Sequence, residues 1–296
     1  MDMDSRQLAC LFTIAREGSF SRAAAFYKLS QPALSRTISQ LERALGARVL
    51  ERGRFGARLN GLGTALVRHA EALQTQLARA REEADLYRQQ FDGVLIVGVT
   101  PISAVDLVPR AIARLIALRP GASIRILELP FELGRAALRR GEIDMYVGPL
   151  QQLGETSDFL ERTILSDPLC VVVSRKHPLA SRRSISLKEI SNYNWVLPTG
   201  SSALVRQLEA LFLTASLPYP RAAVTTDSML ALKGMVKHSG MITIMPRTLV
   251  QLESAAKQLS AIRLTNSGNS RLVGVAWFPD RPLSPLAKLF IDAIKS

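Results

Sequence analysis

One face of a predicted helix near the N-terminus carries side chains suited to reading the edges of DNA bases. Residues 31–45 follow Ser30, a favourable helix N-cap, and carry Pro32 in the first turn, where a missing backbone N–H costs little. Arginine can bond guanine through two hydrogen bonds, and glutamine can bond adenine in the same way. Such a face fits a major groove, and its residues are Gln31, Pro32, Ser35, Arg36, Ser39 and Gln40.

The opposite face of the same segment is apolar and is predicted to pack inward. A helix over residues 8–17 is expected to stop at Gly18, and a short second helix is capped by Ser19 or Ser21. Gly46 ends the third helix. The three helices would form one small unit that presents the polar face. The inward positions of the third helix are Leu34, Ile38, Leu41 and Leu45.

A two-stranded ribbon is predicted directly after this helix. Gly53 and Gly56 would form its tip, surrounded by Arg52, Arg54 and Arg58. Arginines in such a wing suit phosphates or a narrow minor groove. Helix, turn, helix and wing together indicate a DNA-binding unit.

Charge and composition agree with a nucleic-acid partner. The first 62 residues hold ten basic and five acidic side chains, and the whole 296-residue chain has a net charge of +13 and a pI of about 10.4. This excess favours a polyanion, although a merely solvated basic surface is the alternative. Cys10 and Cys170 lie in apolar runs, so buried free thiols are expected, as in a reducing cytosol. The polar N-terminus and the lack of a long apolar run predict a cytoplasmic protein without a membrane partner.

Residues 64–90 are predicted to form one long helix, because they contain neither Gly nor Pro. Their apolar positions alternate at spacings of four and three, which is the pattern of a coiled-coil seam. Packing of the helix on its own domain is the alternative, but the strict alternation favours a second helix as partner. The seam positions are Leu66, Ala70, Leu73, Leu77, Ala80, Ala84 and Tyr87.

From residue 93 onward, short apolar runs alternate with helical patterns. This alternation predicts an α/β domain with a largely parallel sheet and helices on both faces. The predicted strands are 94–99, 123–129, 143–149, 169–174, 194–198, 222–226, 241–246 and 271–278. The predicted helices are 107–120, 131–141, 202–215, 228–240 and 284–296.

Several strand-to-helix junctions of this domain are rich in small polar residues. Ligands of open α/β sheets bind beyond the carboxyl ends of strands, where helix N-termini offer free N–H groups. Simple N-capping is the competing explanation for the hydroxyl groups. The junction residues are Thr100, Pro101, Ile102, Ser103, Thr199, Gly200, Ser201, Ser202, Thr226, Asp227 and Ser228. Residues expected to add apolar or backbone walls are Leu129, Pro130, Phe131, Gly148 and Met245.

Motifs of the common enzyme classes are absent from the sequence. There is no P-loop, no G-x-G-x-x-G, no H-E-x-x-H and no C-x-x-C. The three histidines, His69, His177 and His238, have no cysteine or carboxylate near them in a metal-binding pattern. We therefore expect neither an enzyme, a metal site nor a cofactor.

The segment GSFSRAAAFYKLSQPALSRTISQLERALGARVLER (residues 18–52) resembles the signature of the LysR-type transcriptional regulators. The later phrases VLIVGV, RRGEIDMYVGP and RKHPLA also resemble landmarks of that family. The resemblance implies a winged helix-turn-helix over residues 1–63, a linker helix over 64–90 and an effector-binding domain over 91–296. One departure is Asn60, where many relatives have Thr, followed by the glycine-rich Gly61-Leu62-Gly63, so the resemblance leaves the wing's shape open.

The resemblance also implies roles for particular residues. It implies base contacts for Gln31, Pro32, Ser35 and Arg36, a minor-groove contact for Arg54, and phosphate contacts for Ser21, Arg22 and Lys28. The effector domain would resemble type 2 periplasmic binding proteins, with subdomain I over about 93–165 and 267–296 and subdomain II over about 166–266. The cleft between them would hold a small molecule. The implied partners are double-stranded DNA, a second copy in a homodimer, a homotetramer built from two dimers, and RNA polymerase in the case of activation.

Two other classes of protein share part of this pattern. A solute-binding protein is disfavoured by the N-terminal DNA-binding unit and by the lack of a signal peptide. An α/β enzyme is disfavoured by the lack of a catalytic constellation. The sequence leaves open whether the effector is an organic acid or a sugar derivative, and whether the protein activates or represses.

Overall fold

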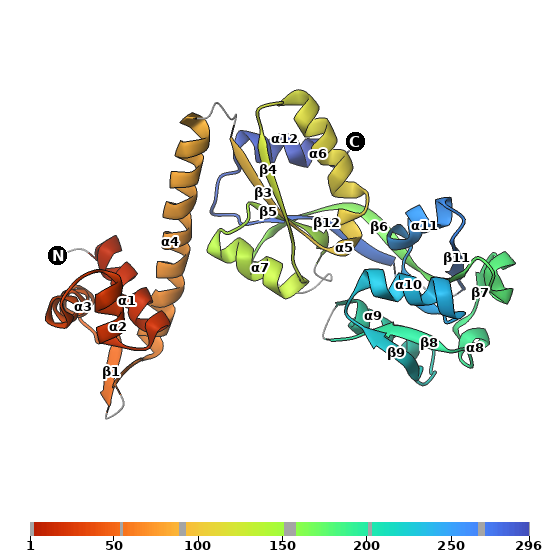
Figure 1. The fold of residues 1–296 in the computed structure, drawn as a ribbon, viewed down its shortest axis with the longest axis horizontal. Coiled ribbons are helices and arrows are strands. Elements are labelled where there is room, and N and C mark those ends of the chain that lie inside the picture. The colour runs from red at the N-terminus through yellow and green to blue at the C-terminus, as the bar shows by residue number, and fades with distance from the viewer. Residues whose placement is uncertain are drawn as a thin grey trace. The chain divides into compact units, whose positions relative to one another are not determined.

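The chain forms two compact units. The computed structural model describes residues 3–53, 56–88, 93–150, 158–200, 203–265 and 270–295. The first unit comprises Met1–Phe91 with Ala136–Glu142, and the second comprises Asp92–Arg135 with Ile143–Ser296 (Figure 1). Each unit has its own hydrophobic core.

The helices of the first unit begin and end at local signals, as predicted. Gly18 and Gly46 end the first and third helices in the left-handed conformation, with φ angles of 64° and 67°. The Ser30 hydroxyl accepts a hydrogen bond from the Ala33 N–H at 3.4 Å and so caps the third helix. The elements are α1 (Ser5–Glu17), α2 (Phe20–Phe26), α3 (Gln31–Leu45), β1 (Leu50–Gly53), β2 (Gly56–Leu59) and α4 (Gly61–Arg88).

The start of α4 differs from the prediction, since the helix begins at Gly61 rather than at residue 64. Asn60 acts as its cap: its Oδ1 accepts from the Gly63 N–H at 2.8 Å, and its Nδ2 donates to the Arg48 carbonyl at 2.7 Å. A Cβ atom on Gly63 would collide with the Val49 carbonyl, so only glycine permits this approach. The unusual Asn60 and Gly63 therefore fasten the wing to α4.

The N-terminal part of the predicted seam packs within its own unit. Leu66 lies against the core of α1, α2 and α3, and Ala70 is fully buried. Further along α4, Leu73 is half-buried and Leu77 is 43% exposed. The part of the seam that is open to another helix therefore begins near Leu73.

The second unit is built on a sheet with strand order β4-β3-β5-β12-β6-β11-β7, with β10 also pairing with β6 and a separate β8-β9 pair. The strands are β3 (Val94–Val99), β4 (Ser123–Glu128), β5 (Met145–Pro149), β6 (Leu160–Ser174), β7 (Ser184–Ile185), β8 (Trp195–Pro198), β9 (Ala222–Thr226), β10 (Thr243–Pro246), β11 (Leu259–Leu264) and β12 (Ser270–Trp277). The helices are α5 (Pro101–Ala104), α6 (Leu107–Leu118), α8 (Leu187–Ile190), α9 (Ala203–Thr214), α10 (Met229–Ser239), α11 (Gln251–Ala255) and α12 (Pro285–Ala293), with 3-10 turns at Pro178–Ser181 and Arg247–Val250. Helix α7 (Phe131–Arg140) begins in this unit, and its residues from Ala136 onward belong to the first unit.

Strand β6 belongs to two halves of this unit. Its residues 160–168 pair with β12, and its residues 169–174 pair with β10 and β11. The first half is built on β3, β4, β5, β12 and residues 160–168, and the second half on residues 169–174 and β7 to β11. The pairing changes between Pro168 and Leu169, close to the boundary at about residue 165 that the resemblance implied.

The prediction of a largely parallel sheet is wrong. Strand β3 pairs in parallel with β4 and β5, but β12 and β6 lie antiparallel to their neighbours. Strand β6 crosses from one half to the other, so it meets β12 from the first half and β10 and β11 from the second in the antiparallel sense.

Candidate functional site

Helix α3 presents the predicted polar face to solvent. Leu34, Ile38 and Leu41 are buried in the core of the unit. On the other side, Gln31, Pro32 and Arg36 are exposed and Ser35 is half-buried. Within the described chain, the Arg36 side chain forms no hydrogen bond or ion pair, so its guanidinium group is available to a ligand.

Helix α2 extends this face. The Ser21 hydroxyl donates to Oε1 of Gln31 at 3.3 Å, so a predicted phosphate contact and a predicted base contact touch each other. Lys28, in the turn between α2 and α3, is exposed and adopts a φ of 53°. Its N–H donates to the Ala25 carbonyl at 3.0 Å, which closes the end of α2. Ser21 and Gln31 therefore meet at the N-terminal end of α3, and Lys28 lies in the turn that leads into it.

Arg22 has a structural contact within the unit. Its Nη2 donates to the Glu17 carbonyl at the end of α1, beside Gly18. The guanidinium thus caps a helix C-terminus, where positive charge is favourable. It has five N–H donors, so this contact does not exclude a second one to phosphate.

The wing is a hairpin in which Leu50 pairs with Leu59 and Gly53 with Gly56. The predicted minor-groove residue Arg54 lies outside the described residues. Glu42 was not predicted to have a role, but its Oε1 accepts from the N–H groups of Val49 at 2.9 Å and Leu50 at 3.4 Å. The carboxylate fixes the point where the chain leaves α3 for the wing.

The second unit contains a cavity of about 510 Å³ at the strand ends. Its walls come from both halves of the unit. The predicted residues that line it are Thr100, Pro101, Ile102, Leu129, Pro130, Phe131, Thr199, Gly200 and Asp227.

Ser103 and Gly148 lie next to the cavity without lining it. The Ser103 hydroxyl is fully buried, donates to the Val147 carbonyl at 2.6 Å and also lies 3.0 Å from the Thr100 carbonyl oxygen. A Cβ on Gly148 would lie 3.0 Å from the Thr100 side chain. Ser103 therefore positions Thr100 through its contacts with the backbone, and Gly148 leaves space for the Thr100 side chain.

The remaining residues predicted for the effector site are not among those that line the cavity. Ser228 caps α10 by accepting from the Ala231 N–H at 3.2 Å, and Thr226 Oγ1 accepts from the Ser228 N–H at 3.1 Å. Met245 is fully buried in the core. Ser201 and Ser202 lie outside the described residues. N-capping thus accounts for Ser228, as the alternative explanation held.

Charged residues of the cavity were missed by the sequence analysis. Arg206 on α9 lies 3.9 Å from a carboxylate oxygen of Glu132. Arg271 on β12 also lines the cavity. The pKa of Arg271 is lowered to about 10, chiefly by burial and also by the charge of Arg206, against an opposing effect of Tyr146. Because β12 reaches the cavity through its antiparallel pairing, no local pattern placed Arg271 there.

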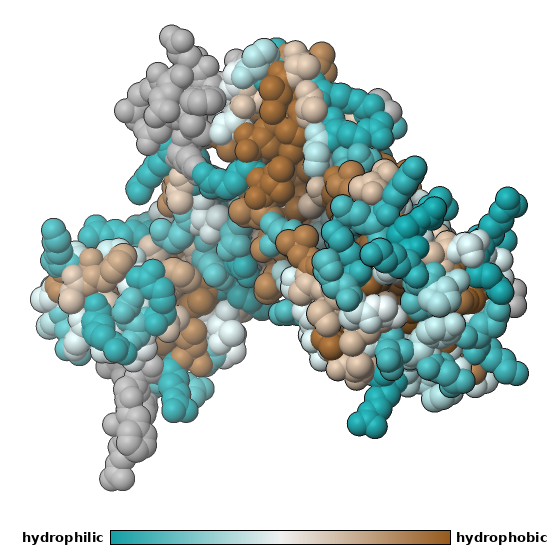
Figure 2. Space-filling view, turned by 45° about the vertical axis from the view of Figure 1, so that its right-hand side comes forward, coloured by the Kyte–Doolittle hydropathy of each residue, from teal (hydrophilic) through white to brown (hydrophobic). Residues whose placement is uncertain are grey.

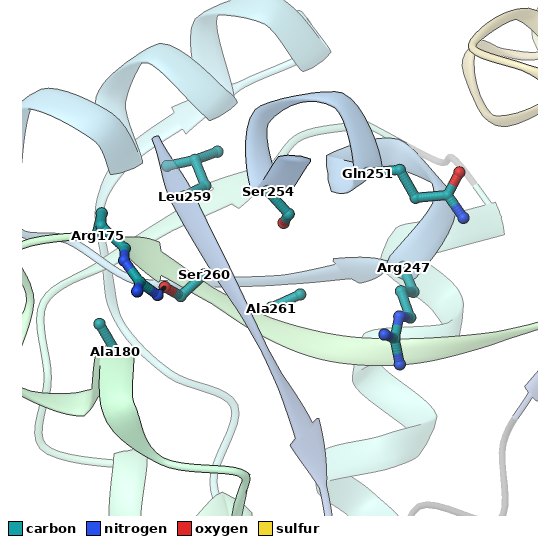
Figure 3. A pocket seen from close by; sticks show the side chains of 8 residues that line it. All are labelled: Arg175, Ala180, Arg247, Gln251, Ser254, Leu259, Ser260 and Ala261. Atoms are coloured by element: carbon teal, nitrogen blue, oxygen red, sulfur yellow. Dashed lines mark hydrogen bonds between the residues drawn. The ribbon is translucent and has the colours of Figure 1, made fainter. Parts of the chain in front are cut away.

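A second hollow, of about 380 Å³, belongs to the second half alone. Figure 3 shows Arg175 and Arg247 at opposite sides of it, with Ser254 and Ser260 between them. Arg175 Nη1 donates to Ser260 Oγ at 3.4 Å. This hollow is therefore polar and one-sided, unlike the cavity between the halves.

Two further features are absent from the described residues. No helix in these ranges is long and apolar enough to cross a bilayer. No group of three or more His, Cys, Asp or Glu side chains in the same ranges could hold a metal ion.

A winged helix-turn-helix joined in one chain to a two-halved α/β unit with a cavity defines the class of ligand-responsive DNA-binding regulators. Residues 5–64 match the model of the bacterial regulatory helix-turn-helix protein, lysR family. Residues 88–296 match the model of the LysR substrate binding domain. The chain therefore belongs to the LysR family of transcriptional regulators, and it is not an enzyme.

Individual proteins are similar over the whole length. The chain is 28% identical over 292 residues to the regulator GbpR of Azospirillum brasilense, covering 98% of this chain and 85% of that protein. A full-length OxyR variant from Pseudomonas aeruginosa has a TM-score of 0.68 at 24% identity and covers 100% and 95% of the two chains. Full-length CbnR in complex with its target DNA has a TM-score of 0.67 at 18% identity and covers 99% of each. These structures share the fold.

Proposed function

We propose that this LysR-type regulator senses a small molecule in the 510 Å³ cavity and converts its binding into altered DNA binding. The observation that carries the proposal is the composition of the walls. Thr100 and Phe131 belong to the first half, whereas Thr199 and Leu204 belong to the second. A ligand that contacts both walls binds one arrangement of the halves better than another and so shifts their equilibrium.

The hollow of Figure 3 is a weaker choice for the effector. All its lining residues lie in the second half, so a ligand there would gain nothing from a change in the angle between the halves. A ligand in the cavity between the halves can favour an arrangement in which the halves are closer together. A ligand in the one-sided hollow cannot.

We further propose that DNA is bound through α2, α3 and the wing of the unit over residues 1–63. Base contacts come from Gln31, Pro32, Ser35 and Arg36, and the wing contributes Arg54. Phosphate contacts come from Ser21, Arg22 and Lys28. The free guanidinium of Arg36 and the exposure of its neighbours support this assignment. Because a regulator acts where DNA is, we place the protein in the cytoplasm.

The working form is proposed to be a homodimer joined by α4, and beyond it a homotetramer. Leu73 and Leu77 leave an apolar stripe on α4 open to a second copy. Exposed Ile116, Leu118 and Ile126 add a second apolar surface on α6 and the edge strand β4. Figure 2 shows a hydrophobic band over the upper part of the molecule, where Figure 1 draws these two elements. Apolar patches of this kind mark interaction surfaces.

The experiment is a footprint titration on the intergenic DNA upstream of the gene, with and without effector. Thr100→Val removes a hydroxyl from the cavity wall, at a cost of about 0.5–1.5 kcal/mol per lost hydrogen bond. The variant should need more effector and bind DNA normally without it. Ser228→Ala, which alters a cap outside the cavity, is the control. A wild-type response in Thr100→Val would contradict the assignment of this wall.

A further inference from the structure

Arg271 is a cation without a counter-ion inside the cavity. Its guanidinium group forms no hydrogen bond or ion pair within the described chain, burial lowers its pKa, and the nearby cation Arg206 lowers it further, against an opposing effect of Tyr146. Arg135, also shielded from water, has Glu161 at 3.5 Å and the ring of Phe159 at 4.6 Å. Holding a half-buried guanidinium unpaired is costly, so an anion would bind there with a gain.

A large part of the remaining wall is apolar and poor in hydrogen-bond donors. Proline has no N–H, and its rings, together with Phe131 and Leu204, present apolar surface to the cavity. An apolar ligand body suits this part of the wall better than a sugar, whose hydroxyl groups would lose water against proline and phenylalanine rings without gaining hydrogen bonds from them. The prolines that line the cavity are Pro101, Pro130, Pro149, Pro198 and Pro246.

Acidic residues limit how much negative charge the cavity can take. Glu128, Glu132 and Asp227 also line it, and all three are exposed. Glu132 already faces Arg206 at 3.9 Å. A second anionic group on the ligand would be repelled by these exposed carboxylates. A ligand with one anionic group is therefore favoured over a ligand with two.

We propose that the effector is an organic monoanion whose oxyanion head pairs with Arg271 and whose apolar body lies against the proline-rich wall and Phe131. This inference depends on the proposed function, because it assigns a chemical class to the same cavity. A carboxylate and a sulfate ester both supply a singly charged oxyanion head, and the experiment below distinguishes them.

The test measures thermal unfolding of the full chain with matched probes. These are benzoate, hexanoate and hexyl sulfate, their neutral counterparts benzamide and hexanamide, the dianion terephthalate, and D-galactose. A ligand that binds the native state raises the melting midpoint. We expect the monoanions to raise it and the amides, terephthalate and galactose to leave it unchanged. Stabilisation by benzoate or hexanoate assigns a carboxylate, and stabilisation by hexyl sulfate alone assigns a sulfate ester. Equal stabilisation by amides and acids, or none by any monoanion, would overturn the inference.

Two variants connect the probes to the residue. Arg271→Gln should weaken monoanion binding roughly 30-fold or more, because it removes one partner of a shielded charge pair. It should also unfold at a midpoint no lower than wild type without ligand, since an unpaired cation has been removed. Arg263→Gln on β11 changes an exposed arginine outside the cavity and should match wild type in both respects. Monoanion binding that survives Arg271→Gln, or a structural collapse of that variant alone, would contradict the role of Arg271.

The DNA readout separates this inference from the proposed function. Galactose that stabilises the chain and alters its DNA footprint, while no acid does, leaves the sensing function standing and overturns the anion. A monoanion that binds through Arg271 without altering the footprint supports the anion and overturns the sensing function.

Discussion

The backbone carbonyl of Val49 occupies the space that a side chain on Gly63 would need. This contact holds the base of the wing against the first turn of α4, where Asn60 accepts from the Gly63 N–H. Gly63→Ala should therefore destabilise the first unit by about 1–3 kcal/mol, because a methyl group forced into a packed site displaces its neighbours.

Denaturant unfolding of the full chain, followed by circular dichroism, measures this loss. Gly61→Ala is the matched control, since a Cβ there meets nothing within 4 Å. The control should be neutral or slightly stabilising, because alanine favours a helix. Equal stability of the two variants would show that the wing base is not packed as described.

Arg36 is predicted to read a base. Arg36→Ala should cost roughly 1–3 kcal/mol at the specific site and relax the preference at one base position. Binding measured by fluorescence anisotropy over a set of single-base operator variants tests this. An unchanged affinity and an unchanged sequence preference would rule out the base contact.

Lys28 provides the contrasting case. Lys28→Gly removes a charge but suits the φ of 53°, so the fold should hold or gain stability. Specific and non-specific DNA should both bind more weakly, and the slope of log K against log salt should fall by about one. Loss at the specific site alone would argue against a phosphate contact.

Features of the DNA-binding surface that depend on contacts between near neighbours in the sequence could be predicted. Features that depend on more distant contacts could not. Ser30 and Gly46 set the ends of α3 through contacts within one turn, and both were predicted. Glu42 caps the entry to the wing across a loop, and no periodicity indicates such a contact.

The residues of the cavity also divide into those predictable from local sequence and those placed by distant strand pairing. Thr100 and Thr199 follow strands directly, so their place at a strand end was predictable. Residues 160–168 and β11 were missed as strands, because their polar and apolar residues mix and only pairing with β12 and β6 makes them extended. Arg271 begins a strand that was predicted, but only the antiparallel pairing of β12 with β5 and β6 brings it to the cavity.

The α4 seam is predicted to join two copies. Leu73→Glu with Leu77→Glu would place charge in an apolar interface, which is expensive without a partner. Analytical ultracentrifugation should show a smaller species, while the second unit remains folded. Arg81→Glu, on an exposed position of the same helix, should leave the oligomer intact. A double mutant that sediments like wild type would refute the seam.

Thiol chemistry is predicted to play no part in sensing. Cys10 and Cys170 are 1% and 3% exposed, and burial raises the pKa of Cys170 to about 12. At pH 8 both thiols should resist a disulfide reagent in the native protein and react fully in denaturant. Peroxide should leave DNA binding unchanged. Rapid native labelling of either cysteine would contradict the buried state.

The central claim is that a ligand in the cavity between the two halves changes how the winged helices hold DNA. The most direct measurement is a footprint titration of the full chain on its upstream intergenic DNA, with and without a monoanion that raises the melting midpoint. The account predicts binding without ligand, and a footprint or DNA bend that changes as the cavity fills, at higher ligand concentrations in Thr100→Val. A footprint that stays the same while the cavity is saturated would contradict it.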